Sequence, residues 1–329
     1  MSRRIAVIGS NSFSGSDFID LLLEDGQNEV AGFSRSPEKD AVFLPYKRHR
    51  KANFRFYQTD LNSDFKRLTS IFEEFKPEYI VNFAAQSEVG PSWQNPWDWF
   101  LTNNVSLSRL CDYLKDARYL KRYVHISSPE VYGTCNGIKE DAPVNPSTPY
   151  AVSKAAADFL LLAYFKNFKF PVCFVRATNV YGARQQLFKI IPRSVINVKL
   201  GKTIELHGGG IAVKSFIHVR DVSRGELAVM EKGTDGEIYH LSPEKGMRVR
   251  DAVKLICDEL GADFNTAAKN VEERAGQDKI YQIDSAKARA QFSWSPKISL
   301  KEGIAGVIGW INDNWPEIQK LPLNYIHKP

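Results

Sequence analysis

Tyr150 and Lys154 are the two residues of this chain whose spacing most directly indicates chemistry. They stand four positions apart in a stretch that predicts a helix from about Thr148, so their side chains lie on one helical face. A lysine so close favours the phenolate, which lowers the pKa of the tyrosine and makes it a usable base near neutral pH. Ser128, at the end of a predicted strand over residues 123–127, can hydrogen-bond the same substrate oxygen. Together these residues predict removal of a proton from an alcohol while a neighbouring cofactor takes the hydride.

A turn that can bind phosphate follows the first predicted strand, residues 5–8. Gly9 and Gly15 stand six positions apart, and Ser12 occupies the place of the usual middle glycine. A strand, a glycine turn and a helix, here over residues 17–24, form the context that a dinucleotide fingerprint requires. The helix N-terminus offers N–H groups to a pyrophosphate, and the hydroxyl of Ser12 can also donate to it. We therefore expect the cofactor to be bound here by Gly9, Ser12, Phe13, Ser14 and Gly15.

The end of the second predicted strand, residues 29–33, favours NADP over NAD. An NAD-preferring site usually ends this strand with an acid that binds the ribose 2′-hydroxyl. Here the strand is followed by Ser34, Arg35 and Ser36, which offer a guanidinium and two hydroxyls to a 2′-phosphate. After the third and fourth predicted strands, residues 53–57 and 79–83, side chains can reach the adenine and the nicotinamide ribose. The further cofactor-binding residues that we expect are Asp60, Leu61, Ala84, Ala85, Gln86, Asn103, Tyr150 and Lys154.

Short apolar strands alternate with helices as far as residue 180, which predicts an α/β fold with a doubly wound parallel sheet of the Rossmann type. The remainder of the chain does not form a self-contained pattern. We expect it to interleave with the Rossmann part and to cover the edge of the sheet where ligands bind. The predicted NAD(P)-binding domain comprises residues 1–180 and 213–240. The predicted smaller α/β substrate-binding domain comprises residues 181–212 and 241–329.

The composition is that of an ordinary globular protein, with 43% hydrophobic and 25% charged residues. A net charge of +6 suits an anionic ligand, and the basic run over residues 47–51 lacks the basic helix or aromatic platform that nucleic-acid binding needs. The four cysteines are dispersed, which excludes a CxxC-type zinc site or a disulfide framework. No signal-peptide pattern and no run of 18 apolar residues is present. We expect a cytoplasmic protein without a metal, a nucleic-acid partner or a membrane partner.

Taken together, these segments resemble the extended short-chain dehydrogenase/reductase family, also called the NAD-dependent epimerase/dehydratase family. Within it, the chain is similar to the nucleotide-sugar 4,6-dehydratases of the dTDP-glucose and GDP-mannose types. The resemblance spans almost the whole chain. It is carried by GSNSFSG at 9–15, NFAAQSEV at 82–89, TNN at 102–104, HISSPEVYG at 125–133, YAVSK at 150–154, RATNVYG at 176–182, SFIHVRDV at 215–222 and RAGQDKIYQID at 274–284.

The resemblance implies that Tyr150 deprotonates the sugar 4-hydroxyl, that Lys154 tunes it, and that Ser128 binds O4. Glu130 matches the glutamate that abstracts the C5 proton, after which water leaves from C6 and the hydride returns to C6. The family recycles a tightly bound NADP or NAD, acts on a nucleoside diphosphate sugar, and forms homodimers through two helices, here about 96–117 and 149–167. Substrate-binding residues implied with Ser128 and Glu130 are Ser87, Glu88, Asn179, Lys189, Ile191, Pro192, Lys214 and Arg274, of which Lys214 replaces a phosphate-binding arginine.

Pro129 departs from the dTDP-glucose dehydratases, which carry at this position an aspartic acid that protonates the departing 6-hydroxyl. Since proline cannot transfer a proton, Glu130 does both jobs, as in the GDP-mannose type, or the reaction differs. We favour a dehydratase. The alternatives are an epimerase acting at C4 or C5, a UDP-uronic acid decarboxylase, a 4-keto reductase, and a regulatory subunit that binds NADP without turnover.

Overall fold

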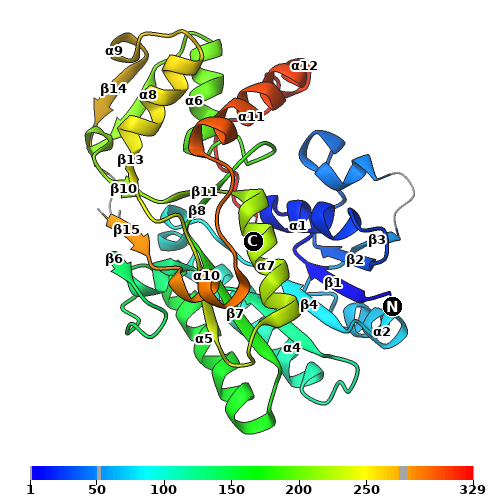
Figure 1. Ribbon diagram of the computed structural model, residues 1–329. Helices are drawn as coiled ribbons and strands as arrows, with labels where there is room; N and C mark the ends of the chain where they lie inside the picture. The colour runs from blue at the N-terminus through cyan, green and yellow to red at the C-terminus, as the bar shows by residue number, and fades with distance from the viewer. Residues whose placement is uncertain (1, 50–52, 274–279, 329) are drawn as a thin grey trace.

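The centre of the protein is a seven-stranded parallel sheet, seen in a computed structural model that describes residues 2–49, 53–273 and 280–328 (Figure 1). Chain order reverses between β1 and β4, which are neighbours, and this reversal creates the crevice in which doubly wound folds bind ligands. The strands, in the order in which they lie side by side, are β12 (Ile238–Leu241), β7 (Val172–Ala177), β5 (Arg122–Ile126), β4 (Tyr79–Asn82), β1 (Arg4–Ile8), β2 (Glu29–Ser34) and β3 (Phe54–Gln58).

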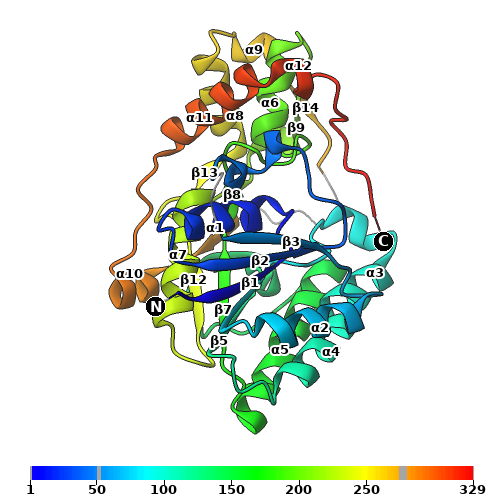
Figure 2. The same cartoon turned by 90° about the vertical axis from the view of Figure 1, so that its right-hand side faces the viewer.

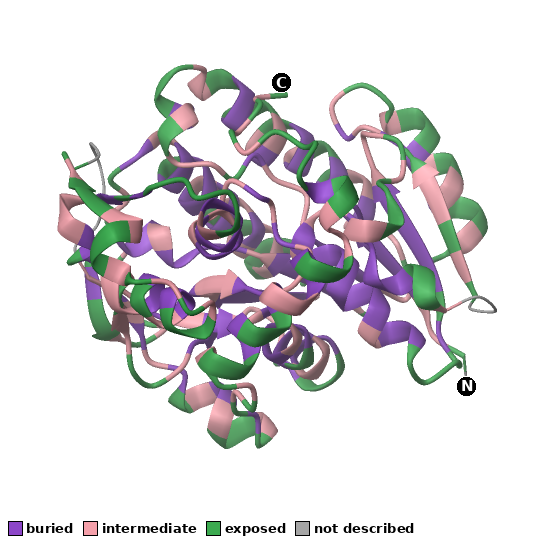
Figure 3. Cartoon of the chain, turned by 90° about the horizontal axis from the view of Figure 1, so that it is seen from above, coloured by how far each residue is buried: buried purple, intermediate pink, exposed green. Residues whose placement is uncertain are grey.

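Both faces of this sheet are covered by helices, which is why its strands appear in the sequence as continuous apolar runs rather than as an alternation. In β1, Ile5 and Val7 enter one core, whereas Ala6 and Ile8 enter the other. Buried residues accordingly concentrate on the sheet and on the helix faces toward it (Figure 3). The first core is closed by α1 (Phe13–Leu23), α7 (Val219–Lys232) and α10 (Ala286–Phe292), and the second by α2 (Phe65–Phe75), α4 (Leu107–Leu114) and α5 (Pro149–Phe168).

The helix expected over residues 96–117 is present as far as residue 114, but it is not α-helical throughout. It consists of α3 (Pro96–Phe100), a π-helical segment η4 (Leu101–Ser106) and α4. Such π-helical turns are rare and often occur at functional sites. This one contains Asn103, whose contacts are described below.

A smaller group of helices packs around its own core, beyond one edge of the sheet (Figures 1 and 2). Tyr181, Val195 and Ile304 are among the residues buried in it. By contrast α10 and Trp294, which lie within the segment predicted as substrate-binding, pack into the first core of the large sheet. The helices of this group are α6 (Ile190–Lys199), α8 (Val249–Glu259), α11 (Leu300–Asp313) and α12 (Trp315–Ile318), and α9 (Phe264–Ala267) packs on a neighbouring small core with α8.

Short strands connect the two parts of the chain. A four-stranded sheet contains β13 (Met247–Arg248), β10 (Val213–Lys214), β15 (Ile280–Ile283) and β6 (Cys135–Ile138), in that order. Two further pairs are β8 (Asn179–Tyr181) with β11 (Phe216–His218), and β9 (Ile204–His207) with β14 (Ala268–Val271). The strands β10 and β11 are separated only by Ser215 and belong to different sheets. No helix that the structure describes is long and apolar enough to cross a membrane.

Candidate active site

Tyr150 and Lys154 lie in the first two turns of α5, and both are buried. The helix starts where it does because the Thr148 side chain accepts a hydrogen bond from the Ala151 N–H (3.2 Å) and Pro149 fits the first helical position. Lys154 Nζ donates to the backbone oxygen of Ile126 at 2.8 Å, at the end of β5. The predicted spacing therefore places both side chains at the carboxyl end of a central strand.

Electrostatics at this pair differ from the expectation drawn from the sequence. Burial raises the pKa of Tyr150, and a hydrogen bond with Ser128 offsets that effect only in part. Burial also lowers the pKa of Lys154, to about 8. The expectation that the pKa of Tyr150 lies below its ordinary value is wrong, because desolvation of the phenolate is the largest effect. Burial of Tyr150 therefore favours its neutral phenol form.

Ser128, Pro129 and Glu130 follow β5 and form the start of a 3₁₀-helix, η5 (Pro129–Tyr132). Ser128 caps it by accepting the Glu130 N–H at 3.2 Å, and Pro129 is buried at the first position, where its missing N–H has no consequence. The proline is therefore compatible with the local backbone, although it cannot supply a proton. Glu130 is half-buried beside it.

Tyr281 is a residue near this centre that the sequence did not single out. It is buried on β15, its hydroxyl is within hydrogen-bonding reach of Ser128, and Glu130 and Tyr150 lie close enough to act on its charge. Burial keeps its pKa well above the ordinary value. The KIYQID portion of the quoted motif was the available signal, but only the tertiary fold brings it to Ser128.

A buried polar network lies behind Lys154. His125 Nε2 is 3.2 Å from Lys154 Nζ, and burial holds the pKa of this imidazole well below its usual range. Asp158 accepts from Ser127 Oγ and from Arg176 Nη2, both at 2.7 Å. Arg176 also donates to Tyr132. Fixed in this way, the groups around the lysine cannot easily move when its charge changes.

A cavity of about 350 Å³ opens where β1 and β4 end, at the reversal of strand order. Gly9 forms its floor with a φ of +86°, and a Cβ there would lie 2.7 Å from the Ala84 backbone nitrogen, so only glycine fits. Within the part of the chain that the structure describes, Asn11 Oδ1 and Thr59 Oγ1 are buried in residues lining this cavity and have no hydrogen-bond partner. Predicted cofactor residues lining it are Gly9, Ser12, Ser34, Arg35, Ser36, Asp60, Leu61, Ala84, Ala85 and Gln86.

The unpartnered oxygens and the glycine floor fit a polar ligand that lies along this edge, as a dinucleotide does. Phe13, Ser14 and Gly15 form the first turn of α1, which begins four residues earlier than the predicted helix. Ser12 Oγ accepts the Gly15 N–H at 3.0 Å, so its own hydroxyl hydrogen remains a possible donor to phosphate. Asn11 orients the second strand's end by donating to Ser36 Oγ at 3.0 Å.

Asn103 does not line the cavity but lies behind it. Its Oδ1 accepts the Gln86 N–H at 2.9 Å, and its Nδ2 donates to Gln86 O at 3.1 Å and to Ser153 Oγ at 2.9 Å. These bonds use the donors of the amide, so Asn103 fixes the backbone of Gln86 and links it to α5. Direct binding of the cofactor by Asn103 stays a prediction.

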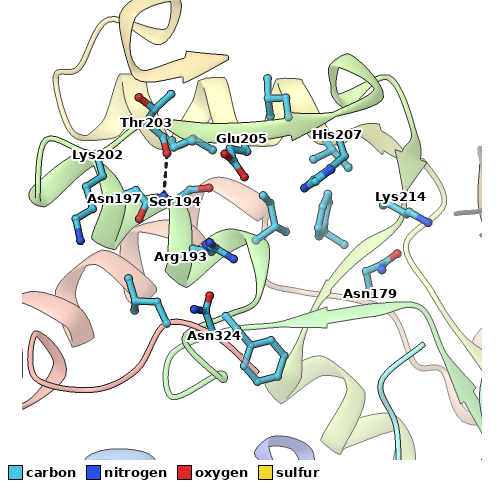
Figure 4. A pocket seen from close by; sticks show the side chains of 17 residues that line it. Asn179, Arg193, Ser194, Asn197, Lys202, Thr203, Glu205, His207, Lys214 and Asn324 are labelled. Atoms are coloured by element: carbon cyan, nitrogen blue, oxygen red, sulfur yellow. Dashed lines mark hydrogen bonds between the residues drawn. The ribbon is translucent and has the colours of Figure 1, made fainter. Parts of the chain in front are cut away.

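A second cavity, of about 480 Å³, lies between β9, α6 and β10 (Figure 4). Two predicted substrate residues, Asn179 and Lys214, line it, and Asn179 Oδ1 is buried without a partner among the described residues. Four further charged or titratable residues line it without having been predicted, namely Arg193, Lys202, Glu205 and His207. These residues could have been predicted only from the knowledge that α6 and β9 face each other across this cavity, which the sequence alone does not reveal.

The remaining substrate predictions have mixed outcomes. Ile191 and Pro192 are buried in α6 on the side away from this cavity, with Ile191 in the core of the helical group, because the helix turns Arg193 and Asn197 to the cavity instead. Lys189 pairs with Glu88 at 2.8 Å. Ser87 and Glu88 line the first cavity rather than the second, whereas Arg274 lies outside the described residues.

Comparison with known proteins agrees with this geometry. The family model described as GDP-mannose 4,6 dehydratase matches residues 7–307. The human dTDP-D-glucose 4,6-dehydratase is 29% identical over 97% of this chain and 93% of its own length. A dTDP-glucose 4,6-dehydratase of Streptomyces antibioticus is 33% identical over 74% of each chain.

Comparison with solved structures also finds dTDP-glucose 4,6-dehydratases among the similar proteins. The dTDP-glucose 4,6-dehydratase DesIV from Streptomyces venezuelae, determined with NAD bound, superimposes with a TM-score of 0.88 at 30% identity, over 95% of this chain and 98% of its own. A UDP-glucuronic acid 4-epimerase from Bacillus cereus has a TM-score of 0.86 at 24% identity, which shows a shared fold alone. The predicted α/β Rossmann fold and the predicted family are confirmed.

Proposed function

Because this chain belongs to the GDP-mannose 4,6 dehydratase family, we propose that it converts a nucleoside diphosphate sugar to its 4-keto-6-deoxy form by loss of water across C5 and C6. The observation that supports this best is the convergence of Ser128, Tyr150 and Glu130 at the carboxyl ends of the central strands. This cluster has a base for the 4-hydroxyl and a second, separate base for C5.

The residues that line the first cavity would hold a nicotinamide dinucleotide, which would supply a hydride acceptor for C4 and a hydride donor for C6. Tyr150 Oη takes the proton of the 4-hydroxyl, and Ser128 Oγ holds O4 by a hydrogen bond. The 4-keto group acidifies the C5 proton, which passes to a Glu130 carboxylate oxygen. Glu130 returns a proton to the departing 6-hydroxyl as water leaves, since Pro129 cannot.

Lys154 acts by charge in this scheme. Its ammonium, fixed by Ile126 O, favours the Tyr150 phenolate as the proton of the 4-hydroxyl is taken up. Closing the site over a sugar also excludes water, which strengthens this interaction. Two protons are removed from the sugar, one from the 4-hydroxyl and one from C5. Two protons are returned, one to the departing 6-hydroxyl as water forms and one to C5 as the C5–H bond re-forms.

The preferred cofactor in this proposal is NADP. Relatives have been solved with NAD, which supports a nicotinamide dinucleotide in general. The preference for NADP over NAD is supported by the residues at the end of β2. Ser34 and Arg35 line the cavity there, and residues 34–36 include no carboxylate that would repel a 2′-phosphate. The cofactor is retained and recycled, because each turnover returns the hydride.

The nucleotide of the substrate is bound in the second cavity. Arg193 and Lys214 offer positive charge to a diphosphate there, and Asn179 Oδ1 offers an unpaired acceptor (Figure 4). Lys214 binds phosphate as a point charge, without the bidentate fork of arginine. The active form is a homodimer, supported by exposed apolar side chains on α3 and α5, including Trp97 and Phe159.

The test is mass spectrometry of the purified protein with NADP and dTDP-, GDP-, UDP- and CDP-sugars in deuterated water. A product lighter by one water, with deuterium at C5, is the expected result. Deuterium uptake without loss of water would assign an epimerase instead, and loss of carbon dioxide from a uronic acid would assign a decarboxylase. Tight NADP binding with no change to any sugar would contradict an enzyme of this class and favour a regulatory subunit.

A further inference from the structure

The segment over residues 323–328 runs down from α12 and ends beside α3, far from the helices that precede it in the chain (Figure 2). We call it the roof segment. Lys328 O accepts hydrogen bonds from Arg35 Nη2 at 2.8 Å and from Gln86 Nε2 at 2.7 Å. Both donors line the first cavity. A carbonyl from one end of the described chain is thus bound by two residues expected to bind the cofactor.

The position of these two donors defines how the roof segment crosses the site. Arg35 follows β2 and Gln86 follows β4, and β1 lies between those two strands in the sheet. The roof segment therefore crosses above the Gly9 turn, where the pyrophosphate of a dinucleotide lies in this fold. Gly9 and Tyr325 line the same cavity, so the open space is between the turn and the segment.

Independent contacts anchor the roof segment at its far end. The imidazole of His327 stacks on the buried Trp99 ring, with centroids 5.2 Å apart and planes 7° apart. His327 Nε2 lies 2.8 Å from Asp98 Oδ2, and its Nδ1 lies 3.1 Å from Tyr325 Oη. These contacts fix the segment to α3, which belongs to the large sheet's helical layer.

The roof segment also places charge at the rim of the cavity. Lys39, Arg35 and Lys328 all line it. The pKa of Lys39 is lowered, first by desolvation and then by the proximity of Lys328. Cations brought together at the mouth of a cavity repel one another, and a phosphate of the ligand relieves that repulsion. Asp60 and Glu88 also line the cavity, but Glu88 is paired with Lys189, so the three cations at the rim still favour an anionic ligand beneath the segment.

We infer that residues 323–328 are a component of the cofactor site, a roof under which the dinucleotide is held and which must detach for the cofactor to exchange. The inference rests on the proposed function only for the identity of the ligand. A cofactor that is recycled at each turnover gains from slow exchange. Because Leu323 and Asn324 line the second cavity, the same segment also forms part of the wall toward the sugar nucleotide.

The test is the dissociation rate of NADPH and of NADH, measured by the fluorescence change when excess oxidised cofactor displaces each of them from the purified protein. Replacing residues 323–328 with glycine and serine is expected to raise both rates at least about tenfold, since changes at an interface act mostly on dissociation. His327→Ala is expected to give a smaller increase, and Lys320→Ala, on the exposed turn before the segment, is the matched control. The melting temperature of each variant shows whether it is folded.

If a variant is folded and its dissociation rates stay within about twofold of those of the unaltered protein, the inference that the segment covers the cofactor is wrong. Slower dissociation or tighter binding would also overturn it, because the segment would then be a competitor of the cofactor. If neither dinucleotide binds the unaltered protein, the proposed function fails as well. No sugar is present in this assay. A positive result therefore supports the roof segment as part of the cofactor site, whatever the identity of the sugar substrate.

Discussion

Lys154 Nζ lies 3.2 Å from His125 Nε2, so the lysine of the proposed catalytic pair contacts a buried imidazole whose pKa is lowered by burial. With Nε2 as acceptor, His125 is the Nδ1–H tautomer. We expect His125→Phe to remove this acceptor, to disfavour the ammonium, and to move the alkaline limb of the activity profile to lower pH, with activity falling about tenfold near neutrality. A full pH–rate profile checks this. An unchanged limb with reduced activity would indicate a role in packing only.

The activity should also decline as pH rises through about 8, the value to which burial lowers the pKa of Lys154. Below that value the ammonium is present and favours the Tyr150 phenolate; above it the amine is neutral and that support is lost. In Lys154→Arg the charge persists at all accessible pH values, so the decline should disappear even if the maximal rate is lower. A decline at the same pH in both proteins would contradict assignment of this limb to Lys154.

Local pattern was sufficient to predict most of the Rossmann part. The strands of the parallel sheet are short apolar runs because both faces are covered, and the glycine turn after β1 has few other uses. Tyr150 and Lys154 could be paired from sequence because a helix fixes residues four apart on one face.

What could not be predicted depends on contacts between distant segments. β6 and β15 contain polar residues and are held by pairing with each other in the four-stranded sheet. This pairing places Tyr281 close to Ser128. Ile191 was expected to bind the substrate, whereas it is buried in the core of the helical group and α6 turns Arg193 to the second cavity. The raised pKa of Tyr150 follows from burial, which spacing alone does not reveal.

Glu130 is expected to carry both the proton abstraction at C5 and the protonation of the departing hydroxyl. Glu130→Gln should reduce water loss by at least about a hundredfold while oxidation at C4 continues, so that reduced cofactor accumulates and is seen by its absorbance. Tyr281→Phe is the comparison, because that phenol also lies near Ser128. A larger loss in Tyr281→Phe than in Glu130→Gln would contradict Glu130 as the acid and assign that role to Tyr281.

Arg35 is expected to decide between NADP and NAD. Arg35→Ala should weaken NADP binding by roughly tenfold to a hundredfold more than it weakens NAD binding, because only NADP has the 2′-phosphate. Arg35 also donates to Lys328 O, so a loss common to both cofactors is expected and is removed by taking their ratio. Titration calorimetry or fluorescence gives both affinities. A ratio unchanged by the substitution would remove Arg35 from cofactor selection.

The exposed face of α3, η4 and α5 is where we expect two copies of the chain to meet. Trp97 and Val105 are 64% and 50% exposed and stand eight positions apart, on one side of the helix, and Phe159 of α5 is 57% exposed. Apolar residues gathered on one surface commonly mark an interface.

Phe159→Glu should therefore convert a dimer to a monomer in light scattering, since burial of an unpaired carboxylate in an interface is costly. Ile211→Glu, at an equally exposed apolar residue outside these helices, is the control and should remain dimeric. If the unaltered protein is a monomer at micromolar concentration, or if both variants dissociate alike, the two helices are not the interface.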